Sequence, residues 1–152
     1  MGVAELSVTG YSEPNPLPRG LLVVPIVRYM ILCNDWHTHG KTGLQVTVVG
    51  LLWTIPPPDD SIYPVTYREF CVFLALTGVR GRGETSIACV AEDSGIKVFE
   101  TPKRIIPPRP DPLEVVGVPF RIRNSVFPRP GHYAVQFWYD SLLVEERPLK
   151  LR

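Results

Sequence analysis

The amino-acid sequence predicts an all-β protein, an antiparallel two-sheet β-sandwich of Ig-like type with about seven or eight strands. The chain has 17 prolines and 12 glycines in 152 residues, scattered between short apolar runs, and this pattern is typical of many turns. No window of three helical turns repeats apolar residues with a helical period, so the pattern does not favour helices. The length suits one domain with an ordinary core.

The clearest element is a β-hairpin over residues 126–149. Asp140 and Ser141 supply a two-residue reversal between its strands. Tyr133, which follows Gly131, resembles the corner tyrosine of Ig-like sandwiches, whose hydroxyl bonds back to the chain. Side chains of the first strand of this hairpin alternate between two faces. The inner set is Tyr133, Val135, Phe137 and Tyr139, and the outer set is His132, Ala134, Gln136 and Trp138.

The upstream strands are predicted from apolar, β-forming runs that end at turn residues. The predicted strands cover residues 21–34, 44–55, 67–79, 85–92, 96–101 and 113–123. A polar reversal from Asn34 to Gly43 joins the first two predicted strands. The prolines of residues 56–60 and 102–112 mark connections that cannot pair as central strands. Residues 26–152 are expected to form the single sandwich domain. Residues 1–25 are a proline-rich extension, either a poorly ordered terminus or an arm that docks on a partner.

Charge and cysteine content limit the function classes. The 16 lysines and arginines nearly balance the 15 acidic residues, so no global field favours nucleic acid or an anionic membrane. The cysteines Cys33, Cys71 and Cys89 form no Cys-x-x-Cys pair and are expected to be buried free thiols in a reducing compartment. The first residues lack the basic start and apolar run of a signal peptide. The sequence therefore predicts a soluble, cytoplasmic protein with no cofactor and no membrane partner.

The order of strands and two short signatures resemble a known family. The matching residues are Val49-Gly50-Leu51-Leu52, Phe127-Pro128, Gly131, Tyr133, Asp140 and Pro148-Leu149. Residues 26–152 resemble a family of small bacterial β-sandwich proteins of unknown function, DUF6941. The resemblance implies the fold and carries no known activity or catalytic residue. Ser141 departs from the glycine that often follows the aspartate in that signature.

One local cluster has the chemistry of a metal site. Asp35, His37 and His39 share parity with Cys33, so a strand that continued through His39 would point all four to one face. Imidazole, carboxylate and thiolate are ligands that Zn²⁺ accepts. The alternative is that both histidines are solvated residues of a turn. Metal binding at Asp35, His37 and His39 is therefore kept as an alternative function.

Catalytic motifs are incomplete. The segment from Gly78 to Thr85 has the spacing of a phosphate-binding loop, but Glu84 stands where that motif needs lysine. The segment also joins two predicted strands and opens no helix. No Gly-x-Ser-x-Gly elbow is present. The sequence predicts that the protein is not an enzyme.

Basic residues recur in the predicted turns, most densely at Arg80 and Arg82. Further basic residues lie in the later connections and the last strands, namely Lys103, Arg104, Arg109, Arg121, Arg123 and Arg129. If these loops converge at one end of the domain, they supply a site for nucleic acid or a phosphorylated ligand. Acidic residues are interspersed among the same loops, so this is a second alternative function.

The leading functional hypothesis concerns the outer face of the closing hairpin. Trp138, Gln136 and His132 are predicted to point outward, and an outward tryptophan is common at interfaces. The alternative is that a long loop covers Trp138. The sequence therefore favours a non-enzymatic protein–protein interaction or structural module, with a protein partner or self-association.

Overall fold

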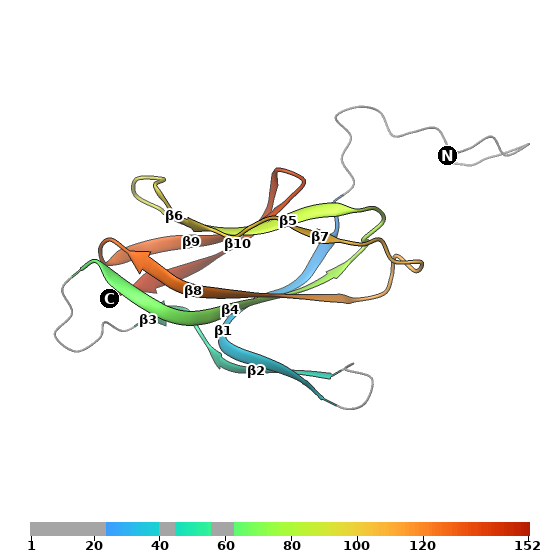
Figure 1. Ribbon diagram of the computed structural model, residues 1–152, viewed down its shortest axis with the longest axis horizontal. Coiled ribbons are helices and arrows are strands. Elements are labelled where there is room, and N and C mark those ends of the chain that lie inside the picture. The colour runs from blue at the N-terminus through green and yellow to red at the C-terminus, as the bar shows by residue number, and fades with distance from the viewer. Residues whose placement is uncertain (1–23, 40–44, 56–62) are drawn as a thin grey trace, which may run out of the picture.

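The computed structural model describes residues 24–39, 45–55 and 63–152, and this part of the chain is all β (Figure 1). No helix occurs within these residues, so they contain no helix that is long and apolar enough to cross a membrane. Ten strands are formed there: β1 (Ile26–His39), β2 (Gln45–Leu51), β3 (Thr54–Ile55), β4 (Val65–Thr77), β5 (Gly83–Ala91), β6 (Lys97–Glu100), β7 (Arg104–Ile106), β8 (Val116–Phe127), β9 (Gly131–Tyr139) and β10 (Leu142–Leu151).

The strands form two sheets that lie one above the other (Figure 1). The first has the order β2-β1-β4-β8 and is antiparallel throughout. The second has the order β3-β10-β9-β5-β6, with β7 beside β5 and only β3 running parallel to its neighbour. The all-β prediction with two sheets is confirmed.

The predicted number of strands is too low, because two short strands formed where the sequence predicted other structure. Thr54 and Ile55 were expected to continue the second predicted strand, but they leave it and pair with Lys150 and Leu151 in the other sheet. Residues 104–106 were expected to be a connection, but they pair with Gly83–Thr85 of β5. Both additions depend on partners distant in sequence, which a local pattern does not reveal.

The first strand is also longer than predicted. Asn34 to His39 were expected to begin a polar reversal, but β1 continues through them because β2 supplies a partner, from Cys33 opposite Leu51 to His39 opposite Gln45. Backbone pairing along a hairpin does not require apolar side chains. The remainder of the predicted reversal, residues 40–43, lies outside the described residues, as do the predicted proline connection at residues 56–60 and residues 1–23 of the predicted extension.

The core lies between the sheets. On β4 and β8 the inward side chains alternate along each strand, and β5, β9 and β10 provide the opposite wall. The inner set predicted for the closing hairpin is correct, since Tyr133, Val135, Phe137 and Tyr139 are each at most 3% exposed. Asp140 and Ser141 both have positive φ, which suits a two-residue reversal whose twist matches the flanking strands.

Gly83, the first residue of β5, is where the core comes closest to the backbone. A Cβ atom at this position would lie 2.0 Å from the Tyr139 ring, whereas one at Gly81 would meet nothing within 4 Å. Tyr139 is buried and its hydroxyl points back at Gly81 O, so the ring has no free space into which to move.

We expect Gly83→Ala to lower the free energy of unfolding by about 1–3 kcal/mol, because the new methyl group overpacks a filled site. Urea denaturation followed by circular dichroism measures the change. Gly81→Ala is the matched control and should shift stability by less than about 0.5 kcal/mol. Equal effects of the two substitutions would contradict the tight contact at Gly83.

Candidate functional site

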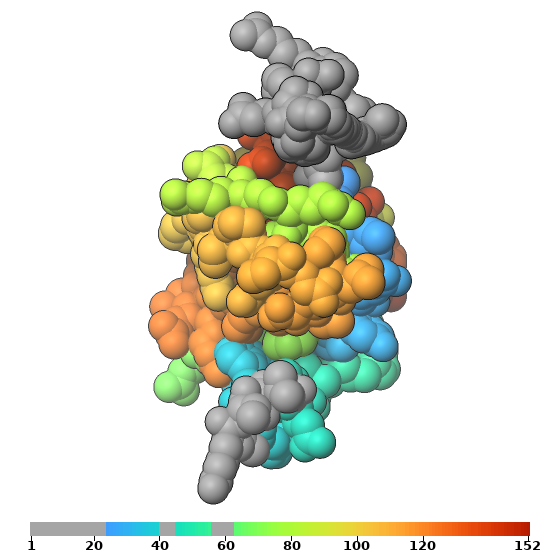
Figure 2. All heavy atoms as spheres, turned by 90° about the vertical axis from the view of Figure 1, so that its right-hand side faces the viewer, coloured from blue at the N-terminus to red at the C-terminus, as the bar shows by residue number. Residues whose placement is uncertain are grey.

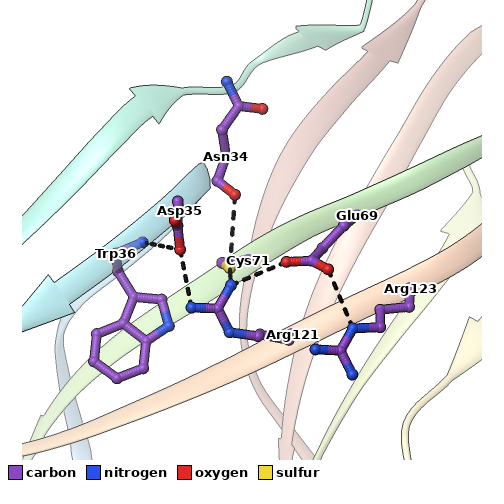
Figure 3. Close-up of polar contacts among 7 residues, drawn as sticks. All are labelled: Asn34, Asp35, Trp36, Glu69, Cys71, Arg121 and Arg123. Carbon is purple, nitrogen blue, oxygen red and sulfur yellow. Dashed lines mark hydrogen bonds and ion pairs between the residues drawn. The ribbon is translucent and has the colours of Figure 1, made fainter.

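Three surface features of the described residues carry polar chemistry, and the first is an ion-pair cluster on the outer face of the first sheet (Figure 3). Arg121 on β8 donates to Asp35 Oδ1 at 2.9 Å and to Glu69 Oε2 at 3.0 Å, thereby linking β8 to β1 and β4. Arg123 Nε donates to Glu69 Oε1 at 3.1 Å. The Arg121 guanidinium also lies 5.8 Å from the centroid of the Trp36 ring.

The charges of this cluster balance within it. The pKa of Asp35 is lowered first by the Trp36 backbone N–H and then by Arg121, and the pKa of Glu69 is lowered first by Arg123. Both carboxylates are therefore ionised at neutral pH, each facing a guanidinium. A cluster of two arginines and two carboxylates that satisfy one another clamps three strands together and leaves no charge for a ligand.

The two cysteines beside this cluster are buried and protonated. Cys33 and Cys71 lie opposite each other on β1 and β4, and both are free. Burial raises the pKa of Cys33 to about 11 and also raises the pKa of Cys71. Cys89, in the core, has its pKa raised by burial to about 12. Since the thiolate is the reactive form, these thiols are poor nucleophiles at neutral pH.

The metal hypothesis required that Asp35, His37 and His39 come together. The strand does continue through His39, and the two imidazole rings lie 5.0 Å apart in an edge-to-face arrangement. However, Asp35 is turned to Arg121, and His39 is hydrogen-bonded to Thr47 Oγ1. Within residues 24–39, 45–55 and 63–152, no group of three or more histidine, cysteine or acidic side chains is placed to hold a metal ion.

The second feature is a concentration of basic side chains at one end of the sheets. The loop between β4 and β5 carries Arg80 and Arg82, and both are exposed. This loop is tied to the segment after β7, because Gly78 N donates to Pro112 O at 2.6 Å and Arg109 N donates to Val79 O at 3.3 Å. Figure 2 shows the two segments stacked at this end, the yellow-green loop directly above the orange segment.

We call this region the arginine end and define it by its basic side chains, which are Arg28, Arg80, Arg82, Lys103, Arg104 and Arg109. Four acidic side chains lie among them, namely Glu84, Asp111, Glu114 and Asp140. The ion pairs between the two sets are long, 3.9 Å for Lys103 with Glu84 and 3.9 Å for Arg109 with Glu114. In the part of the chain that the structure describes, Arg80 and Arg82 make no ion pair, so their guanidinium groups face solvent.

The third feature is a groove of about 220 Å³ on the outer face of the second sheet, the Trp138 groove. Its lining comes from β5, β6, β9 and the connections beside them, and consists of Glu84, Ser86, Lys97, Glu100, Lys103, Trp138 and Ser141. The Trp138 indole is half-buried, and its Nε1 donates to Gln136 Oε1 at 3.1 Å. Gln136 in turn donates to Glu146 at 3.4 Å, and His132 lies exposed at the far end of β9.

Comparison with known proteins adds a distant likeness. Neither a family model nor a curated protein sequence matches the chain, so the similarity to DUF6941 stays a prediction. A solved structure that matches is that of the Pseudomonas fluorescens alkylpurine DNA glycosylase AlkC bound to DNA containing an abasic site analog. The match has a TM-score of 0.45 and 11% identity, and it covers 66% of this chain and 28% of the glycosylase chain. A likeness at this level transfers neither the activity nor a DNA site to this chain.

The leading functional hypothesis from the sequence is corrected here. The sequence favoured a protein–protein interaction or structural module, whereas a solved structure that matches is that of an enzyme bound to DNA, and the structural-module prediction is not retained. The structure also shows how the residues of the proposed surface lie. Trp138 forms part of a polar groove rather than a flat outward patch, and the Gln136 amide is engaged by Trp138 and Glu146.

The raised pKa values predict how the thiols react. At about pH 8 only about one in a thousand Cys33 thiols is ionised, so a thiol-specific disulfide reagent should leave the native protein almost unlabelled. In denaturant, all three cysteines should react. Thiol labelling followed by mass spectrometry checks this, and rapid labelling of the native protein would contradict it.

The same pKa values predict an alkaline loss of stability. The unfolded state loses its thiol protons as the pH rises through 9.0, the ordinary pKa of the thiol, whereas the native state retains them. The free energy of unfolding should therefore fall as the pH rises from about 9 towards 11. Denaturation at a series of pH values measures the slope, and Cys89→Ser, whose hydroxyl does not titrate in this range, should reduce it.

Proposed function

We propose that the protein binds the phosphate backbone of nucleic acid through the arginine end. The observation that carries this proposal is that Arg80 and Arg82, exposed and without an ion pair among the described residues, project from a loop that is anchored to the Arg109 segment. Guanidinium groups donate paired hydrogen bonds to phosphate oxygens, and they remain charged at every physiological pH.

The scaffold supports this role by fixing the loop rather than leaving it free. β4 and β5 lie in different sheets, and the loop that joins them is held by the backbone bonds of Gly78 and Val79 to the segment after β7. The Asp140 carboxylate accepts from Glu84 N at 3.0 Å and so secures the start of β5. A fixed loop loses less conformational entropy on binding than a mobile one.

The near-neutral net charge of the chain does not oppose the proposal. A local field depends on how charges are distributed, and at the arginine end six basic side chains stand against four acidic ones. Three other arginines are neutralised at short range, Arg121 and Arg123 by Asp35 and Glu69, and Arg129 by Asp93 at 2.9 Å. The arginine end therefore keeps a local excess of positive charge.

The finer details of the fold and setting belong to the same proposal. We infer an Ig-like sandwich, and the Tyr133 hydroxyl, which donates to Arg129 O at 2.5 Å as a corner tyrosine would, supports it. The buried free thiols are what a cytoplasmic protein is expected to keep. The role that we propose is binding, without a catalytic step.

The test is binding of fluorescently labelled DNA, single-stranded and duplex, measured by anisotropy at about 50 and 200 mM salt. We expect the affinity of the natural chain to fall steeply with salt. Arg80→Ala combined with Arg82→Ala should weaken binding of both forms about tenfold or more at low salt, and should reduce the logarithmic salt slope by about 1.4–1.8, as expected for two lost phosphate contacts.

The matched control removes the same charge elsewhere. Arg123→Ala combined with Arg129→Ala eliminates two exposed arginines that are already paired with carboxylates. This variant should weaken DNA binding much less than the variant at the arginine end. Absence of salt-dependent binding in the natural chain, or equal losses in the two double variants, would refute the proposal.

A further inference from the structure

The Trp138 groove and the arginine end share two residues. Glu84 and Lys103 line the groove, and their side chains also belong to the charges of the arginine end. Arg82 precedes Glu84 by two residues, so the Cα atoms of the two residues are at most about 7 Å apart. A ligand whose charged group binds Arg80 and Arg82 can therefore place its next chemical group in the groove.

The groove differs from the arginine end in its charge. Lys97 pairs with Glu100 at 3.0 Å, and Lys103 lies 3.9 Å from Glu84. The two cations and two carboxylates balance, so nothing in the groove favours a second phosphate. It suits a neutral group that can accept from lysine and serine and donate to carboxylates.

Trp138 supplies an aromatic surface in this groove. Its N–H is already used by Gln136, so the indole offers its π face rather than a hydrogen-bond donor. Stacking of a nucleobase on such a ring is the usual way in which proteins hold single-stranded nucleic acid. The groove volume of about 220 Å³ matches about seven water molecules, which is room for one base and not for a base pair with its backbone.

We propose that the Trp138 groove binds one unstacked nucleobase of a single strand whose phosphates lie on the arginine end. This inference rests on the proposed function. The carboxylates of Glu84 and Glu100 set a base preference, because they accept hydrogen bonds from the exocyclic amine of cytosine, whereas thymine presents an acceptor oxygen at the same position. A duplex keeps its bases stacked and paired, and therefore gains nothing from the groove.

The experiment compares labelled oligocytidine, oligothymidine and duplex DNA of about ten nucleotides or base pairs. We expect the natural chain to bind oligocytidine more tightly than oligothymidine. Trp138→Ala should weaken binding of oligocytidine about five- to a hundredfold, as expected for one lost stacking contact, and leave duplex binding unchanged. Trp138→Phe keeps an aromatic face and should restore most of the loss.

Two further variants separate stacking from other causes. Trp53→Ala removes an exposed tryptophan outside the groove and should leave all three affinities unchanged. Glu100→Gln removes one acceptor charge and should bring the ratio of cytosine to thymine affinity closer to one, whatever its effect on overall affinity. Circular dichroism on each variant shows that the sheets are intact.

The outcomes distinguish the two proposals. If Arg80→Ala with Arg82→Ala abolishes binding while Trp138→Ala and Trp53→Ala act alike on oligocytidine, the base site is refuted and the phosphate site stands. If oligocytidine and oligothymidine bind equally to the natural chain, the carboxylate preference is refuted. If no DNA binds in a salt-dependent manner, the proposed function fails and the base site fails with it.

Discussion

The passage of the chain from β4 in the first sheet to β5 in the second is the constraint on which the rest of the structure depends. Each is a central strand of its own sheet, and both are buried over most of their length. Because they are consecutive elements in different sheets, the chain between them must cross from one layer to the other at one end of the molecule. Arg80 and Arg82 sit on this crossing, so the packing that closes the core also places them.

Two groups of arginines lie in different environments. On the outer face of the first sheet, Arg121 and Arg123 are matched by Asp35 and Glu69 at hydrogen-bonding distance, and their role is to join strands. At the arginine end, ion pairs are long or absent among the described residues. Since a paired charge exerts little field beyond its partner, only the second environment is suited to recognise an anion.

The second sheet separates its two faces by chemistry. Along β9, Tyr133, Val135, Phe137 and Tyr139 fill the core, while Trp138 contributes to a groove with acidic, basic and hydroxyl side chains around it. Gly83 makes this arrangement compact, because the absence of a side chain lets Tyr139 close under the start of β5. The Trp138 groove and the loop that carries Arg80 and Arg82 therefore meet at the start of β5.

The sequence by itself determined the all-β class, the inner and outer faces of β9, the reversal at Asp140 and the burial of the three cysteines, because alternation, turn residues and apolar context act over a few neighbouring positions. It could name Arg80 and Arg82 but could not say which loops would meet. Only the tertiary structure decided that Asn34–His39 stay in a strand, that Asp35 turns to Arg121, that residues 104–106 pair with β5, and that Trp138 borders a groove. Each of these depends on a partner more than ten residues away in the chain or on another strand, and that partner is chosen by the packing of two sheets rather than by local pattern.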